Sequence, residues 1–290
     1  MGRSKKLIQF YLTNMCNSGC KTCNIWKNKC RQELDIDVVK RTMMDFPDAD
    51  YVLGGGEFTL YSKRLELLKW CNENNINYTV LTNAVSRKLV DSLFDSARIK
   101  SLTISCDGKT HDYVRGVLGN LSNIEYLVSK YRDKVDTIKL SYTLSKFNEA
   151  HIDSDMEYFK SLGFDKIYFC IAQNMDLLNA TGDLTPSVES LKYLYETYGY
   201  MLYDKDYQLL GDIIRGVHKR CSSTNNVHTI YTEGDVVLCQ SKMSFDVLGN
   251  INDTPLKEIL EKENYKDFTC KYNDTCELVC QRRYDYEDRV

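Results

Sequence analysis

Short runs of apolar and β-branched residues alternate with amphipathic stretches through the first two thirds of the chain. This pattern is typical of repeated strand–helix units that form a parallel sheet. Six runs have the length and composition of strands, at residues 7–12, 50–53, 77–81, 101–105, 137–142 and 166–171. Between them, apolar residues recur at helical spacing, at residues 36–46, 64–74, 87–94, 121–131 and 152–162. The sequence therefore predicts an α/β fold with ligand sites in the loops after the strands.

The pattern changes after about residue 184. Residues 186–203 are predicted to form a further helix, and residues 255–263 a short one. A β-hairpin is expected between residues 229–231 and 236–238, with Gly234 in its turn. We therefore divide the chain into a core of residues 1–184, a helical connection of residues 185–220 and a small hairpin and helix module of residues 221–290.

Composition limits the class of protein and its location. The chain has 290 residues, 38 Lys and Arg against 41 Asp and Glu, and a net charge of −3, which disfavours nucleic acid as a partner. No apolar run is long enough for a membrane span or a signal peptide, so we expect a cytoplasmic protein without a membrane partner. Because the cytoplasm is reducing, the twelve cysteines indicate metal binding or thiol chemistry rather than disulfides.

Three cysteines follow the first predicted strand. Cys16, Cys20 and Cys23 have the spacing C-x3-C-x2-C, which is short enough for three thiolates to meet at one metal centre. Structural zinc sites and iron–sulfur clusters normally take four protein ligands. The triad therefore indicates either a remote fourth ligand or an open coordination position, and by itself it fits a zinc site equally well.

Polar and glycine-rich motifs follow the next three predicted strands. Gly54–Glu57 is the sequence Gly-Gly-Gly-Glu, in which glycines permit close approach of a ligand. Asn83 follows the third strand. The fourth strand ends at Ser105, and Arg115 follows ten residues later. A hydroxyl and a forked guanidinium are good partners for a carboxylate. Each motif alone also fits a turn or a polar strand end.

Taken in order, these motifs and the segment from Cys16 to Trp26 resemble the radical S-adenosylmethionine (SAM) superfamily. The resemblance implies a partial (β/α)6 barrel. It implies that Cys16, Cys20 and Cys23 bind a 4Fe-4S cluster whose fourth iron is reserved for SAM. The implied SAM contacts are Gly55, Gly56 and Glu57 at the amino group, Ser105 and Arg115 at the carboxylate, and Asn83 nearby.

A second group of cysteines lies in the last 70 residues and comprises Cys221, Cys239, Cys270, Cys276 and Cys280. With Gly234 five residues before Cys239, the pattern resembles the SPASM and shorter Twitch extensions of radical SAM enzymes. A full SPASM pattern has further cysteines, and Asp267 stands where one of them is expected, so the resemblance implies one auxiliary 4Fe-4S cluster. Cys221, Cys239 and Cys280 match ligand positions, and either Cys270 or Cys276 completes the set. A zinc-stabilised hairpin is the alternative.

The resemblance implies reductive cleavage of SAM to a 5′-deoxyadenosyl radical, fed by an electron donor such as a flavodoxin or ferredoxin. The radical abstracts hydrogen from a substrate, which we expect to be a peptide or protein that is crosslinked, oxidised or epimerised. A Twitch-type dehydrogenase acting on a small alcohol or sugar is the alternative among enzymes. A zinc-binding interaction protein and an iron–sulfur electron carrier are the alternatives outside enzymes, although neither needs the predicted SAM contacts.

No catalytic residue is assigned, but two cysteines near strand ends are candidate hydrogen-atom donors to a substrate radical. These are Cys106 and Cys170. Because side chains alternate along a strand, Cys106 is expected to point away from the side of Ser105, which counts against it.

Overall fold

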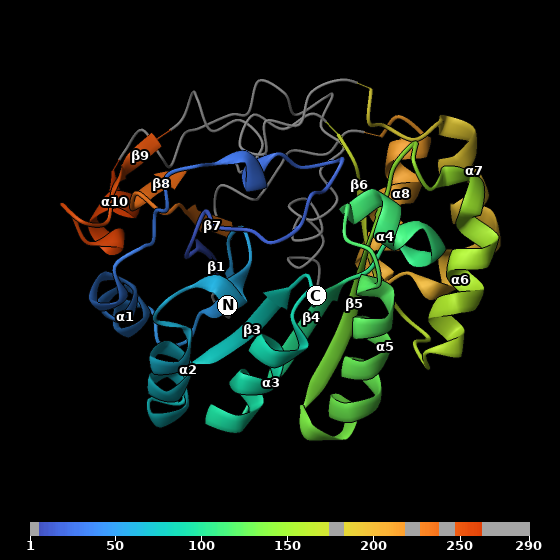
Figure 1. Ribbon diagram of the computed structural model, residues 1–290. Coiled ribbons are helices and arrows are strands. Elements are labelled where there is room, and N and C mark those ends of the chain that lie inside the picture. Colours follow the sequence, from blue (N-terminus) through green and yellow to red (C-terminus); the bar gives the residue numbers. More distant parts are fainter. Residues whose placement is uncertain (1–5, 174–182, 218–226, 238–246, 263–290) are drawn as a thin grey trace.

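The structure is a computed structural model that describes residues 6–173, 183–217, 227–237 and 247–262. The strands described there form one nine-stranded sheet with the order β6-β5-β4-β3-β2-β1-β7-β8-β9 (Figure 1). Strands β1 to β6 are parallel to their neighbours. Their bounds are Leu7–Tyr11, Asp50–Gly54, Asn77–Thr82, Ser101–Ser105, Thr137–Leu144 and Tyr168–Ile171. All six predicted strands are thus confirmed, with ends that differ from the prediction by at most two residues.

Helices cover the convex side of the curved sheet (Figure 1). The helices that follow successive strands are α1 (Ile36–Asp45), α2 (Arg64–Glu73), α3 (Arg87–Ser96), α5 (Asn120–Tyr131) and α6 (Ile152–Ser161), which confirms the five helices predicted there. The shorter elements among them are α4 (His111–Arg115) and the 3-10 turns η1 (Ile25–Lys27), η2 (Phe58–Leu60), η3 (Gly108–Thr110), η4 (Arg132–Lys134) and η5 (Glu149–His151). The described strands leave a partial barrel that is not closed, since β6 and β9 lie at opposite edges of the sheet.

The helix predicted at residues 186–203 ends earlier than expected. Helix α7 (Val188–Tyr198) is followed by a 3-10 turn, η6 (Gly199–Met201), and then by a separate helix, α8 (Asp204–Ile214), which the sequence pattern did not predict. The break has a physical cause, because the chain after the turn pairs with Ile167 beside β6: the Ile167 amide donates to the Met201 carbonyl at 2.8 Å. A continued helix would use these backbone groups internally.

The C-terminal hairpin extends the core sheet. Strands β7 (Val227–Ile230) and β8 (Asp235–Val237) are antiparallel, and Gly234 lies in their turn with φ +90°, as predicted. Strand β7 also pairs in parallel with β1, and β9 (Val247–Asn250) completes the sheet. Helix α10 (Leu256–Glu261) follows, and the Arg41 guanidinium of α1 donates to the Ile251 carbonyl at 2.8 Å. The hairpin is therefore fixed against the start of the barrel.

The two faces of the barrel sheet differ in chemistry. Residues such as Ile8, Phe10 and Val80 are fully buried under the helices. On the concave face, Gln9, Thr79, Ser141 and other polar side chains are only half-buried. A parallel sheet covered on both faces is usually apolar on both. The polar concave face therefore indicates a cavity for a ligand.

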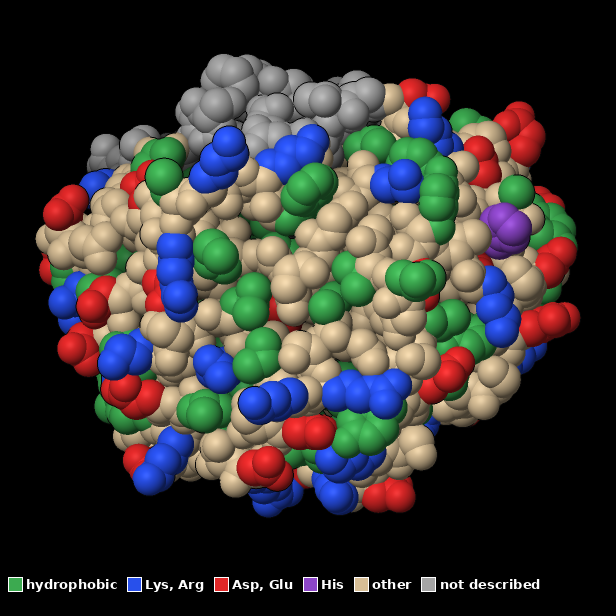
Figure 2. Space-filling view, viewed as in Figure 1, with side chains coloured by type: hydrophobic (Ala, Val, Ile, Leu, Met, Phe, Trp, Pro, Cys, Tyr) green, Lys and Arg blue, Asp and Glu red, His purple; other side chains and the backbone are tan. Residues whose placement is uncertain are grey.

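The face of the molecule shown in Figure 2 does not favour a polyanionic partner. On the face shown in Figure 2, basic and acidic side chains are interspersed, and no extended basic area forms there. None of the helices in the described ranges has the length and apolar composition of a membrane span.

Asp155 of α6 supports the loop that follows β4. Its carboxylate is buried and accepts hydrogen bonds from the Lys109 amide at 2.7 Å and the Tyr142 hydroxyl at 3.0 Å. Burial raises the pKa of Asp155 from its ordinary value near 3.8 to about 7, against the opposing effect of these two hydrogen bonds. The folded protein therefore binds a proton at Asp155 more tightly than the unfolded chain does.

We expect this carboxyl group to make the protein less stable as the pH rises from about 4 to about 7, because the folded state holds the proton that the unfolded state releases. The loss is on the order of 2–4 kcal/mol, since one pKa unit corresponds to about 1.4 kcal/mol. Asp155→Asn, which cannot ionise, should flatten this part of the curve in urea unfolding measured at several pH values. Asp133→Asn, at an exposed site, is the control and should leave the slope as in the wild type. If the unfolding free energy of Asp155→Asn changed with pH as steeply as that of the wild type, the raised pKa of Asp155 would be contradicted.

Candidate active site

The three N-terminal cysteines lie in residues 13–24, which we call the cysteine loop. On one side this loop contacts the segment after β2: the Gly56 amide donates to the Thr13 carbonyl at 2.7 Å, and the Glu57 amide donates to the Met15 carbonyl at 2.8 Å. A Cβ atom on Gly56 would lie 2.4 Å from the Met15 carbonyl oxygen, and one on Gly55 would lie equally close to that of Thr13. The two glycines are therefore required by the close approach of two backbone segments.

On its other side the cysteine loop contacts the end of α4. The Gly19 amide donates to the Arg115 carbonyl at 2.9 Å, and the Lys21 amide donates to the Val114 carbonyl at 2.8 Å. Gly116 ends α4 with φ +65°, and a Cβ atom there would lie 2.5 Å from the Gly19 carbonyl oxygen. The loop is thus held by backbone contacts from both β2 and α4.

Neighbouring polar groups contact two of the thiols. The side-chain amide nitrogen of Asn83 lies 3.7 Å from the Cys16 sulfur and also donates to the Ser18 hydroxyl at 2.9 Å. The Ile25 amide donates to the Cys23 sulfur at 3.5 Å. Burial raises the pKa of Cys16 to about 12 and that of Cys23 to about 11. The raised pKa values mean that the thiolates are costly to form here, and a positively charged metal centre would offset that cost.

The cysteine loop forms one wall of a cavity of about 310 Å³, which we call the upper cavity. The cavity brings together the residues that the sequence assigns to the cluster and to SAM: Cys16, Cys20, Cys23, Gly55, Gly56, Glu57, Asn83, Ser105 and Arg115. Cys170 also lines it. Cys106 does not, because it follows Ser105 on the opposite side of the strand and is fully buried in the apolar core, as alternation predicts.

Glu57 is fully enclosed, and three neighbours hold its carboxylate. It accepts hydrogen bonds from the backbone amide of Asn83 and the Thr82 hydroxyl, both at 2.7 Å, and from the backbone amide of Thr59 at 3.1 Å. Burial raises the pKa of Glu57, and these donors act in the opposite direction. Glu57 also lines the upper cavity, so this buried carboxylate gives that part of its wall a negative potential.

Arg115 is fixed by Asp107 through two hydrogen bonds. Its Nε and Nη2 atoms lie 2.5 and 3.1 Å from the Asp107 carboxylate oxygens, and the Asp107 side chain is 1% exposed. Burial alone would lower the pKa of Arg115, but Asp107 and Cys20 raise it above its ordinary value. The guanidinium therefore stays charged, and because it also lines the upper cavity it can attract an anion there.

Three residues that were not among the predicted site residues are buried beside the site: Asp107, His111 and Asn120. The Asp107 amide donates to His111 Nδ1 at 3.1 Å, and His111 Nε2 lies 2.8 Å from the amide nitrogen of Asn120. Asn120 also donates to the Asn83 carbonyl at 3.0 Å. Burial lowers the pKa of His111 to about 4, so the ring is neutral near pH 7. These contacts connect the loops after β3 and β4.

The second cysteine group lies outside the described residues. This applies to Cys221, Cys239, Cys270, Cys276 and Cys280, and to Asp267. Their assignment stays a prediction.

Comparisons with known proteins agree with the geometry. A sequence model of the radical SAM superfamily matches residues 10–159, more than half of the chain. The protein belongs to the radical SAM superfamily. A model of the iron–sulfur cluster-binding SPASM domain matches residues 221–282, so the chain is a radical SAM enzyme with a C-terminal SPASM domain. A comparison with curated protein sequences finds no match.

Solved structures share the fold at low sequence identity. SuiB of Streptococcus suis, bound to its precursor peptide SuiA, has a TM-score of 0.73 and 15% identity, over 94% of this chain and 71% of that one. Native anSMEcpe with AdoMet and the Cp18Cys peptide has a TM-score of 0.66 and 18% identity, over 93% of this chain and 87% of that one.

The family implies SAM on a 4Fe-4S cluster, and the SPASM domain implies an auxiliary iron–sulfur cluster. The upper cavity fits the first pair, because three cysteines, a buried carboxylate and a charged guanidinium face one space. Within the described ranges, no three His, Cys, Asp or Glu side chains close around a single metal ion. A cluster does not require this, since the three thiolates bind three different iron atoms and the fourth iron takes SAM instead.

Two glycines with the same φ test the contact between α4 and the cysteine loop. Gly116 and Gly216 both have φ +65°, but a Cβ atom on Gly216 would meet nothing within 4 Å. We expect Gly216→Ala to cost about 1–2 kcal/mol, the ordinary penalty of a left-handed alanine. Gly116→Ala pays the same penalty and also displaces Gly19, so it should lose iron on anaerobic reconstitution and lower the melting temperature further. Equal iron content in the two variants would contradict this account.

Proposed function

We propose that this radical SAM enzyme modifies a peptide or protein by crosslinking, oxidation or epimerisation. The observation that carries the proposal is the fold shared along 94% of the chain with SuiB, whose structure holds a precursor peptide. The barrel supports it, because a second cavity of about 430 Å³ adjoins the upper cavity. With SAM in the upper cavity, this volume suits one side chain and its adjoining backbone.

Each residue of the upper cavity has a role in this proposal. Cys16, Cys20 and Cys23 hold the cluster through their thiolates. Glu57, with the backbone of Gly55 and Gly56, faces the ammonium group of SAM and attracts it by charge. Ser105 and Arg115 bind the carboxylate, and Asp107 positions Arg115. Asn83 orients the cysteine loop through its contacts with Cys16 and Ser18.

When bound and reduced, the cluster supplies the electron that cleaves SAM to methionine and a 5′-deoxyadenosyl radical. A flavodoxin or ferredoxin is proposed as the electron donor. We retain the division into residues 1–184, 185–220 and 221–290, with Cys221, Cys239, Cys280 and either Cys270 or Cys276 as ligands of the auxiliary cluster.

The first experiment uses the enzyme reconstituted anaerobically with iron and sulfide. We expect about eight irons per chain, falling to about four in the Cys16/Cys20/Cys23→Ala variant, because each 4Fe-4S cluster contributes four. That variant should also lose 5′-deoxyadenosine formation, measured by liquid chromatography. The presence of zinc without cluster absorption would contradict the assignment.

The substrate class is tested with the peptides encoded by short reading frames beside the gene, against a panel of sugars and small alcohols. We expect a peptide to stimulate 5′-deoxyadenosine formation and to lose a pair of hydrogen atoms, or to take up deuterium from heavy water at unchanged connectivity, both seen by mass spectrometry. Stimulation by sugars or alcohols alone would contradict the peptide proposal and favour a small-molecule dehydrogenase.

For an epimerisation, the substrate carbon radical needs a hydrogen atom, and Cys170 is the better placed of the two candidate donors. Its side chain lines both cavities and is half-buried, whereas Cys106 is enclosed in the core. Transfer of the thiol hydrogen leaves a sulfur radical, which an electron from the donor and a proton from water restore to the thiol.

We therefore expect Cys170→Ser to keep 5′-deoxyadenosine formation but to lose deuterium incorporation into an epimerised peptide in heavy water, because an alcohol O–H is a poor hydrogen-atom donor. Cys30→Ser, at an exposed cysteine, is the matched control and should behave as the wild type. Undiminished deuterium incorporation in Cys170→Ser would exclude Cys170 as the donor.

A further inference from the structure

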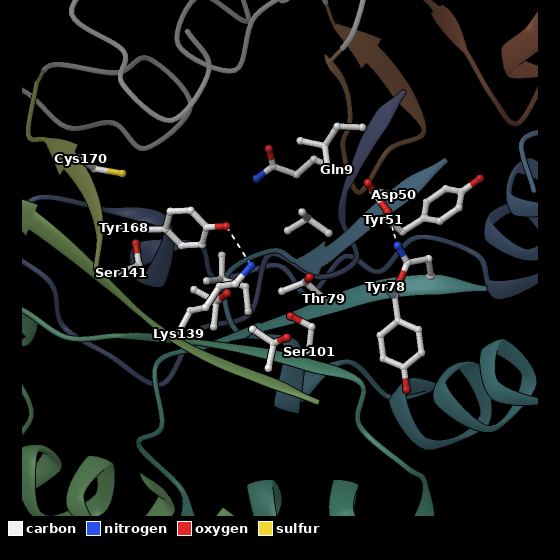
Figure 3. A pocket seen from close by; sticks show the side chains of 16 residues that line it. Gln9, Asp50, Tyr51, Tyr78, Thr79, Ser101, Lys139, Ser141, Tyr168 and Cys170 are labelled. Atoms are coloured by element: carbon white, nitrogen blue, oxygen red, sulfur yellow. Dashed lines mark hydrogen bonds between the residues drawn. The ribbon is translucent and has the colours of Figure 1, made fainter. Parts of the chain in front are cut away.

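The second cavity lies on the concave face toward the N-terminal ends of the barrel strands, and we call it the lower cavity (Figure 3). Its walls include residues that begin strands, among them Leu7, Asp50 and Ser101. The two cavities adjoin, because Gln9, Leu81, Ser141 and Cys170 line both. A substrate group in the lower cavity would thus lie next to SAM in the upper one.

Lys139 of β5 supplies a cationic group to the lower cavity. Figure 3 shows its side chain extending from β5 toward Tyr168, and its Nζ atom donates to the Tyr168 hydroxyl at 2.9 Å. Strand register places Ser141 beside Ser105, so Lys139 lies two residues deeper along the barrel. At about 3.3 Å per residue, this step is about 6.6 Å. The ammonium therefore belongs to the layer below the residues assigned to SAM.

No carboxylate of the described chain lies within ion-pair distance of Lys139. The side chain is half-buried, and its ammonium has three donors, of which Tyr168 takes one. Asp50 lines the same cavity across from Lys139, but the Asn77 amide donates to its carboxylate (Figure 3). The other nearby groups are hydroxyls and amides, including Thr79, Ser101 and Ser141. A partly desolvated cation in such a setting gains most from a bound anion.

We infer that the lower cavity binds a carboxylate group of the substrate through Lys139, with Tyr168 positioning the ammonium. This inference rests on the proposed peptide substrate and deepens it, since the residue that enters the barrel would carry either an acidic side chain or a C-terminal carboxylate. Lys139 contacts the substrate and takes no part in hydrogen transfer.

The test measures binding to the reconstituted enzyme with SAM but no reductant, so that no turnover occurs. Isothermal titration calorimetry compares an acetylated, amidated pentapeptide with a central glutamate against its glutamine counterpart. We expect the glutamate peptide to bind about tenfold more tightly, as one charge-assisted hydrogen bond predicts. A comparison of acetylated penta-alanine as free acid and as amide tests whether a C-terminal carboxylate is bound. Glutarate tests whether a carboxylate is bound without a peptide.

Lys139→Gln should abolish the preference for the carboxylate probe, and Lys139→Arg should retain it because the charge remains. Lys88→Gln, at an exposed lysine of α3, is the control and should match the wild type. Melting temperature and iron content establish that each variant is folded and loaded. Should Lys139→Gln fail to load, Lys139→Met offers an apolar side chain of similar length.

The inference is overturned if no carboxylate probe is preferred by the wild type, or if the preference persists without the charge at position 139. These outcomes are distinct from failure of the proposed function. Lys139-dependent binding of glutarate in an enzyme that modifies no peptide would support the anion site and reject the peptide substrate. If wild type and Lys139→Gln bind and modify a peptide equally well, the peptide substrate is supported and the anion site is rejected.

Discussion

The backbone contacts on the two sides of the cysteine loop determine the position of the other site residues. Gly56 and Glu57 donate to the loop from the end of β2, and the loop donates in turn to the carbonyl groups of Val114 and Arg115. Since the loop follows β1, these contacts tie together segments from three separate strand–helix units. They also place the side chains of Glu57 and Arg115 at the walls of the same cavity. The thiols, the carboxylate and the guanidinium thus depend on one arrangement of backbone hydrogen bonds.

Much of the barrel was predictable because its signals are local. The strand at residues 101–105 was predicted with its observed bounds, and the Asp35 side chain caps α1 by accepting from the amides of Asp37 and Val38. Periodicity also predicted that Cys106 points away from Ser105. The role of Gly55 and Gly56 was understood only in part. They were expected to permit approach of a ligand, whereas the structure shows that their surface is also in contact with the cysteine loop.

Features that depend on distant contacts were beyond prediction from local patterns. The pairing of β7 with β1 joins residues more than 200 positions apart, and nothing in the hairpin sequence specifies that neighbour. The end of α7 depends on pairing with Ile167, and the contact between His111 and Asn120 depends on how α4 and α5 pack. Each requires that the sheet already be assembled. The polar concave face was predictable only in part. The sequence shows that Ser101, Thr103 and Ser105 share one face of their strand, but it does not show that this face is the concave one.

The charged groups of the two cavities differ in how completely the protein satisfies them. In the upper cavity, three donors hold Glu57 and a bidentate contact with Asp107 holds Arg115, so both are oriented before any ligand binds. Such preorganisation suits a cofactor with fixed shape and charge, since the protein bears the cost of ordering during folding rather than on binding. Among the described residues, Lys139 has one hydrogen-bond partner, the Tyr168 hydroxyl, and its ammonium sits on a flexible stem. A group of this kind can adjust to the position of a substrate carboxylate, while the adjoining SAM contacts remain fixed.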